Sequence, residues 1–116
     1  MKITSMNPVF VAKDVSGFIS LYKGMFGFSV KHVLNAENST VTVLENADGV
    51  RIDAVQRNVE KSYMGVRINV DNFEDALKEH LERGFMIIEE ENTPSNRLAL
   101  IVRENGTEIL LVQHRK

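Results

Sequence analysis

The clearest strand pattern in the sequence lies just past its midpoint. Val66, Ile68 and Val70 are apolar and alternate with the polar residues Arg67 and Asn69. Successive side chains of a strand point to opposite faces of its sheet, so this alternation predicts a strand with one buried face.

A helix and three more strands are predicted after this strand. Asp71 or Asn72 stands at the N-cap position, and Gly84 stands where a helix ends. Apolar spacing predicts that the helix buries Phe73, Ala76, Leu77, His80 and Leu81. Strands are predicted at residues 86–90, 97–103 and 108–113, with turn-forming residues between them. The order in this half is strand, helix, strand, strand, strand.

The first half of the chain shows the same order. An apolar stretch at residues 8–12 precedes Asp14, which we predict to be the N-cap of a helix that Gly27 ends. The helical spacing is carried by Phe18, Leu21, Tyr22 and Met25. Strands are predicted at residues 28–34, 40–44 and 50–55.

The two halves are related by an internal repeat with a period of 57 positions. Asp14, Gly27, Phe28, Gly49, Ile52, Val55 and Gln56 recur as Asp71, Gly84, Phe85, Gly106, Ile109, Val112 and Gln113. Glycine and glutamine would not coincide merely because a core needs apolar residues. We therefore predict two βαβββ modules, about residues 1–57 and 62–116, within one domain of 116 residues.

Composition removes several classes of function. The 14 basic residues are scattered among 16 acidic ones, which argues against a nucleic-acid partner. The absence of cysteine removes disulfides, thiolate nucleophiles and cysteine-ligated metals. No apolar run approaches the roughly 20 residues that span a bilayer, so we expect no membrane partner and a cytoplasmic location.

The repeated motifs resemble those of the glyoxalase / bleomycin-resistance / extradiol-dioxygenase (vicinal oxygen chelate) superfamily. They are the run from Val9 to Asp14 with Leu21 to Phe28, the run from Val70 to Ala76 with Gly84-Phe85, and the closing run from Asn105 to Gln113. The resemblance implies an α+β fold in which two βαβββ modules form curved mixed sheets around a cleft, with the helices on the outside. It also implies a homodimer, since short members commonly complete their clefts across a two-fold axis.

Many members of that superfamily hold a divalent metal on the first and last strands of each module. The matching positions here are Asn7, Asp53, Leu110 and either Gly65 or Met64. Only Asp53 offers a charged oxygen, whereas catalytic metals generally need three or more protein ligands. His32, His80 and His114 show no partner at metal-binding spacing. We therefore expect no metal and no other cofactor.

Strand alternation then predicts the side chains that face the cleft and bind a small-molecule ligand. The predicted ligand-binding residues are Asn7, Arg51, Asp53, Arg67, Asn69, Glu108 and Leu110. Arg51, Asp53 and Arg67 would orient a polar ligand, or would simply pair with one another inside the protein. Asp53 and Glu108 form a pair for acid–base chemistry only if the modules face as in the superfamily, so no catalytic residue is assigned.

Three functions remain open. The first is a metal-free binding protein of the bleomycin-resistance type, which holds a small molecule and does no chemistry. The second is a lyase or isomerase of the same superfamily that uses a divalent metal or a carboxylate base. The third is a non-catalytic dimeric interaction module. The missing metal ligands favour the first, and hence a protein that is not an enzyme.

Overall fold

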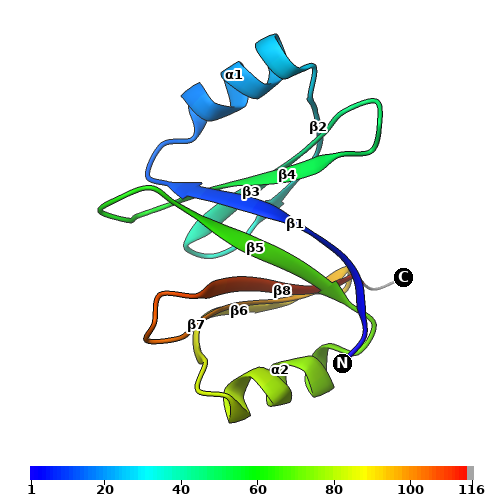
Figure 1. Ribbon diagram of the computed structural model, residues 1–116, viewed down its shortest axis with the longest axis vertical. Coiled ribbons are helices and arrows are strands. Elements are labelled where there is room, and N and C mark those ends of the chain that lie inside the picture. Colours follow the sequence, from blue (N-terminus) through cyan, green and yellow to red (C-terminus); the bar gives the residue numbers. More distant parts are fainter. Residues whose placement is uncertain (115–116) are drawn as a thin grey trace. The chain divides into compact units, whose positions relative to one another are not determined.

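The computed structural model describes residues 1–114, which divide into two compact units (Figure 1). The N-terminal unit is Asn7–Met64, and the C-terminal unit combines Met1–Met6 with the chain from Gly65 onward. The units follow the two predicted modules, except that the first six residues belong with the second one. The single-domain organisation stays a prediction.

The N-terminal unit is a mixed four-stranded sheet with one helix. Its elements are β1 (Ile3–Ala12), α1 (Ser16–Phe26), β2 (Ser29–Asn35), β3 (Ser39–Glu45) and β4 (Arg51–Arg57). The strand order is β2-β3-β4-β1, in which β1 runs parallel to β4 and the other pairs are antiparallel. The strand predicted at residues 8–12 is longer than expected, since β1 already begins at Ile3.

The C-terminal unit repeats this topology. Its elements are β5 (Tyr63–Val70), α2 (Phe73–Glu82), β6 (Met86–Asn92), β7 (Asn96–Val102) and β8 (Glu108–His114). The order is β5-β8-β7-β6, with β5 parallel to β8. Both units are βαβββ modules, which confirms the predicted α+β class.

Helix α2 covers one face of its sheet and is amphipathic. Phe73, Ala76 and Leu77 pack into a core with apolar residues of β5, β7 and β8. Asn72 is the N-cap, because its Oδ1 accepts a hydrogen bond from Asp75 N at 3.2 Å. The prediction that Leu81 is buried was wrong, since 42% of Leu81 is exposed at the end of the helix.

Helix α1 begins one residue later than predicted. Its N-cap is Val15, which is buried, and not Asp14. Asp14 Oδ1 accepts hydrogen bonds from Ser16 N at 2.9 Å and Ser16 Oγ at 2.8 Å. These bonds hold the pKa of the Asp14 carboxyl below its usual value, the backbone bond being the larger cause. The apolar Val15 takes the capping position because it fills the space between α1 and the sheet.

The glutamine of the repeat joins the last strand of each module to the start of its helix. Gln113 Oε1 accepts from Phe73 N at 2.7 Å, while its Nε2 donates to Asp71 O at 2.9 Å. Gln56 Oε1 accepts from Val15 N at 3.3 Å. The glutamines therefore recur because each satisfies an otherwise unpaired donor at a helix N-terminus.

The repeated glycines also have a structural reason. Gly27 and Gly84 follow the two helices with φ angles of +72° and +92°, a backbone conformation that glycine adopts most readily. After α1, Phe28 N donates a hydrogen bond to Tyr22 O, whereas after α2 Phe85 N donates one to His80 O. The repeat is thus out of phase by one residue in this last helical turn.

Candidate functional site

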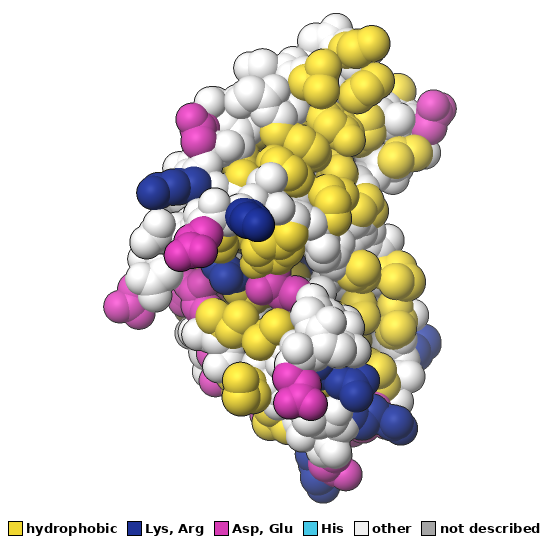
Figure 2. All heavy atoms as spheres, turned by 60° about the vertical axis from the view of Figure 1, so that its left-hand side comes forward, with side chains coloured by type: hydrophobic (Ala, Val, Ile, Leu, Met, Phe, Trp, Pro, Cys, Tyr) yellow, Lys and Arg dark blue, Asp and Glu magenta, His cyan; other side chains and the backbone are white. Residues whose placement is uncertain are grey.

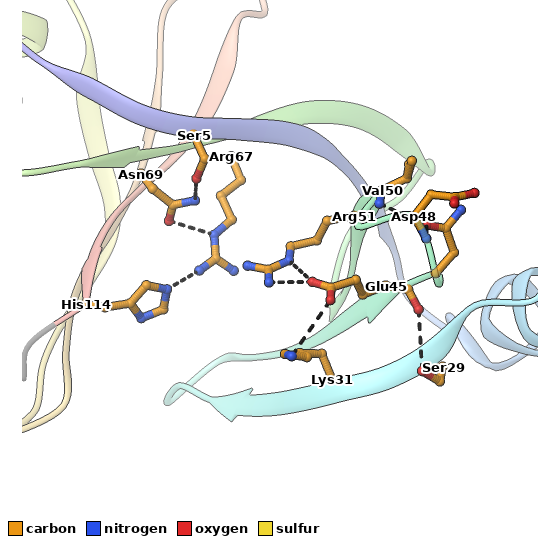
Figure 3. Close-up of polar contacts among 11 residues, drawn as sticks. Ser5, Ser29, Lys31, Glu45, Asp48, Val50, Arg51, Arg67, Asn69 and His114 are labelled. Carbon is orange, nitrogen blue, oxygen red and sulfur yellow. Dashed lines mark hydrogen bonds and ion pairs between the residues drawn. The ribbon is translucent and has the colours of Figure 1, made fainter.

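A hydrogen-bond network surrounds the fully buried Arg67 in the C-terminal unit (Figure 3). Arg67 Nε donates to Asn69 Oδ1 at 3.1 Å, and Asn69 Nδ2 donates to Ser5 Oγ at 2.8 Å. Thr4 Oγ1 donates to the Asn69 carbonyl at 3.1 Å. The first residues of β1 are therefore tied to β5 by polar contacts.

His114 extends this network from β8 to β7. Arg67 Nη2 lies 2.8 Å from His114 Nε2, and His114 Nδ1 lies 2.7 Å from Asn96 Oδ1. A guanidinium can only donate, so Nε2 must be the acceptor and Nδ1 must carry the hydrogen that Asn96 accepts. The contacts assign His114 to one neutral tautomer.

The prediction that β5 has only one buried face was wrong. Ile68 and Val70 pack towards α2, but Arg67 and Asn69 on the opposite face are also buried, with exposed fractions of 0% and 6%. The apolar side chain of Leu110 lies beside Arg67 in the parallel register and is 4% exposed. A charged group at an apolar sheet face is costly to bury, which makes Arg67 the most unusual side chain of this unit.

In the N-terminal unit, the predicted residues Asn7 and Asp53 are also buried. Asp53 lies on β4 opposite Val9 and Val43 and is 0% exposed. The Asn7 amide donates through Nδ2 to Pro8 O at 2.9 Å. Both side chains sit on a sheet face lined by valines, as the predicted alternation required.

Arg51 is instead half-exposed and belongs to an ion cluster. Its Nε donates to Glu45 Oε2 at 3.0 Å, and Lys31 Nζ lies 3.8 Å from Glu45 Oε1 (Figure 3). The hydrogen bond from Arg51 and the charges of both cations hold the pKa of the Glu45 carboxyl below its usual value. The pairing of Arg51 is thus intramolecular, but its partner is Glu45, whereas the sequence suggested Asp53.

The residues at the superfamily's metal positions do not fit a divalent cation. Leu110 and Gly65 bring no donor atom, and a Cβ on Gly65 would lie 3.3 Å from the Glu108 carbonyl oxygen. Glu108 itself is half-buried at the start of β8. Within residues 1–114, no group of three histidine, aspartate or glutamate side chains is placed to hold a metal ion.

An open pocket of about 430 Å³ lies in the N-terminal unit, away from the predicted ligand residues. It is bounded by the turn between β2 and β3 and by the end of β4. Its lining is Lys13, Ala36, Glu37, Asn38, Ser39, Thr40, Gln56, Arg57 and Asn58. The lining mixes charges of both signs and contains none of the seven predicted residues.

His80 and His114 differ in role. His80 is packed, as predicted: it is 7% exposed, its Nδ1 lies 2.7 Å from Ala76 O, and its ring meets Phe85 edge-on. His114 was not predicted as a site residue, although it binds Arg67. Its position on β8, four residues after Leu110, was the available signal, since alternate residues of a strand share a face.

In the part of the chain that the structure describes, no helix is long and apolar enough to cross a membrane. The cytoplasmic location stays a prediction.

No protein-family model and no curated protein matches the sequence. Solved structures do match. Methylmalonyl-CoA epimerase from Mycobacterium tuberculosis is similar with a TM-score of 0.75 and 12% identity, over 98% of this chain and 90% of that one. A variant of the Streptomyces coelicolor methylmalonyl-CoA epimerase, in complex with 2-nitronate-propionyl-CoA, has a TM-score of 0.73 and 13% identity, over 99% of this chain and 100% of that one.

A hypothetical protein from Bacillus halodurans is also similar, with a TM-score of 0.67 and 13% identity over 99% of this chain and 95% of that one. The epimerases belong to the vicinal oxygen chelate superfamily that the motifs resemble. At these identities the likeness establishes the fold.

Proposed function

We propose that this protein binds a small organic anion without a divalent metal, and that Arg67 is the group that recognises the anion. The observation that carries the proposal is the buried arginine itself, which is held by Asn69 and His114 and lies beside the apolar side chain of Leu110. Guanidinium groups bind carboxylates through two parallel hydrogen bonds, and a fixed guanidinium loses little freedom on binding.

The class of ligand is inferred from the structural neighbours. They include methylmalonyl-CoA epimerases in complex with 2-nitronate-propionyl-CoA and one in complex with methylmalonyl-CoA. We therefore take acyl-CoA esters that carry a second acidic group as the first ligands to test. Because Arg67 is fully buried, a ligand must displace covering side chains, so slow association is expected.

A thermal-shift titration tests this proposal. A ligand that binds only the folded protein raises its melting temperature, and a concentration 100 times the Kd stabilises by about 2.7 kcal/mol. Arg67→Lys keeps the charge but removes the planar fork, so we expect at least tenfold weaker binding of methylmalonyl-CoA. Arg103→Lys, which changes an arginine that lies over Phe85, is the matched control. Equal shifts in wild type and Arg67→Lys would refute the role of Arg67.

A second candidate is an isomerase that acts on a CoA ester with a carboxylate base. It is favoured by the structural comparisons, in which methylmalonyl-CoA epimerases recur, and they support it better than a protein that only binds. Such a reaction removes a proton from the carbon next to the thioester and returns one to the opposite face. Asp53 and Glu108 are the carboxylates available for this role.

Hydrogen exchange separates the two candidates. In D₂O, an isomerase replaces the α-proton of methylmalonyl-CoA with deuterium, which proton NMR follows directly. Exchange that is lost in Asp53→Asn or Glu108→Gln identifies an enzyme with that carboxylate as base. A thermal shift without exchange identifies a binding protein.

A further inference from the structure

The open pocket of the N-terminal unit is lined mainly by polar side chains. Its volume of about 430 Å³ lies within the range of small-molecule sites, which is roughly 300–1,000 Å³. The chain between β1 and α1, the β2–β3 turn and the chain after β4 form it on one side of the unit (Figure 1). Figure 2 brings this side forward and shows basic and acidic side chains interspersed on it. The pocket therefore offers charges and hydrogen bonds rather than an apolar surface.

The second copy of the module provides an internal comparison for this pocket. Thr40 lies opposite Gln56 on β3 and β4, just as Arg97 lies opposite Gln113 on β7 and β8. The guanidinium of Arg97 extends over the first residue of α2, with its Cζ 4.4 Å from the centre of the Phe73 ring. The shorter Thr40 cannot cover its own module in this way. The same corner of the sheet therefore stays open in the N-terminal unit.

The repeated glutamine leaves one hydrogen-bond donor at this pocket. In the C-terminal unit both ends of the Gln113 amide are used, since Oε1 accepts from Phe73 N and Nε2 donates to Asp71 O. Gln56 Oε1 likewise accepts from Val15 N, but within residues 1–114 its Nε2 donates to no protein group. The structural role of the glutamine thus accounts for only half of the Gln56 amide, and the other half can donate to a ligand.

Three further lining side chains have no partner inside the described part of the protein. Among residues 1–114, the side chains of Lys13, Glu37 and Asn58 take part in no ion pair or hydrogen bond. Lys13 and the half-buried Arg57 bring two positive charges to the lining, against the single carboxylate of Glu37. The net charge of the lining is therefore positive, which favours a ligand with an anionic group.

We propose that this pocket is a second binding site, and that its ligand is a sugar phosphate. The phosphate accepts charge-assisted hydrogen bonds from Lys13 and Arg57. Sugar hydroxyls both donate and accept, so they match the amides of Gln56 and Asn58, which offer both kinds of group. The carboxylate of Glu37 accepts from hydroxyls, which gives this negative charge a role beside an anionic ligand.

The lining argues against other phosphorylated ligands. Its described residues include no aromatic side chain on which a nucleobase could stack. The one apolar residue among them is Ala36, which is too small to hold an acyl chain. None of the lining residues belongs to the network of Arg67, so this site is additional to the one proposed for the organic anion.

An NMR titration of the nitrogen-15-labelled protein with glucose 6-phosphate tests the proposal. The backbone amide signals of Ser39, Thr40 and Asn58 should shift and saturate, whereas those of Arg67 and Asn69 should not move. Glucose and inorganic phosphate each carry half of the ligand, so each should bind at least tenfold more weakly. Equal affinity for glucose 6-phosphate and for either half overturns the proposal, as do shifts centred on Arg67 or the absence of saturable shifts.

Two variants assign the binding to the pocket. Lys13→Met removes an exposed cation of the lining and should weaken glucose 6-phosphate binding at least fivefold, whereas Lys78→Met, which removes an exposed lysine of α2, is the matched control and should not. Thr40→Met gives this position a side chain about as long as that of Arg97 without its charge, so it should block the pocket. Lys13→Met decides the test if Thr40→Met does not fold, because the exposed Lys13 side chain makes no hydrogen bond or ion pair within residues 1–114. Wild-type affinity in Lys13→Met, or in a folded Thr40→Met, overturns the proposal.

Discussion

Arg67 donates a hydrogen bond from Nη2 to Nε2 of His114 at 2.8 Å, so His114 must carry its hydrogen on Nδ1. This tautomer is the less common one for a free imidazole in water, and Asn96 stabilises it by accepting from Nδ1 at 2.7 Å. The orientation of the buried guanidinium thus depends on a histidine at the end of the last strand.

The first prediction concerns this tautomer. Nitrogen-15 NMR near pH 7.5 should show the shift of a protonated Nδ1 and an unprotonated Nε2 for His114. In Arg67→Lys the Nε2 signal should move, because the guanidinium donor is gone, whereas the His80 signals should not. A protonated Nε2 in the wild type would contradict the network.

Replacing His114 should destabilise the protein through Arg67. His114→Leu removes one acceptor of the buried Arg67 guanidinium, and losing a hydrogen bond to a charged group costs about 1–3 kcal/mol. Urea unfolding measures this change in the free energy of unfolding. His32→Leu, which changes a half-buried histidine on β2, is the comparison, and a larger loss in His32→Leu would oppose the assigned role of His114.

The two repeated glutamines should differ in their contribution to stability. Gln113 makes two hydrogen bonds, at 2.7 and 2.9 Å, whereas the bond to Gln56 Oε1 is 3.3 Å long. Gln113→Ala should therefore cost about 2 kcal/mol and Gln56→Ala about 1 kcal/mol or less. Thermal unfolding of both variants decides the order, and equal losses would argue against the longer bond being the weaker one.

Acid should weaken the ion cluster on the N-terminal unit. The pKa of Glu45 is lowered in the folded protein, so the unfolded chain binds a proton at this group at a higher pH than the folded one. The stabilisation is complete above the usual value of 4.5 and is lost as the pH falls through the lower folded value.

An NMR titration of the Glu45 carboxyl measures this directly. Its midpoint should lie below 4.5 in the wild type and rise in Arg51→Met, since the hydrogen bond from Arg51 is the largest cause of the shift. Lys31→Met should raise it less, because Lys31 lies 3.8 Å from the carboxylate. A wild-type midpoint at or above 4.5 would contradict this explanation.

Much of the fold could be predicted because the same local signals occur twice. Gly27 and Gly84 end the helices by the backbone conformation they permit, which is a property of the residue itself. The start of α1 was misplaced because burial of Val15 against the sheet outweighs the capping preference of Asp14. Such a competition depends on tertiary packing, which a local pattern does not contain.

The site was less predictable for the same reason. The sequence identified Arg67 and Asn69 as neighbours on one strand face, and the structure joins them by a hydrogen bond. It did not identify Ser5, which is 64 positions away from Asn69 and lies in a segment without apolar periodicity. His114 was missed because its partner Arg67 comes from a different strand, 47 positions earlier.

The most direct test of the central claim is calorimetric titration of methylmalonyl-CoA into the wild-type protein after treatment with a chelator. Binding with the same Kd in the presence of chelator and of added Co²⁺, and at least tenfold weaker binding to Arg67→Lys, is the predicted result. Binding that appears only with the metal, or that is equally tight in Arg67→Lys, would contradict metal-free recognition of an anion by Arg67.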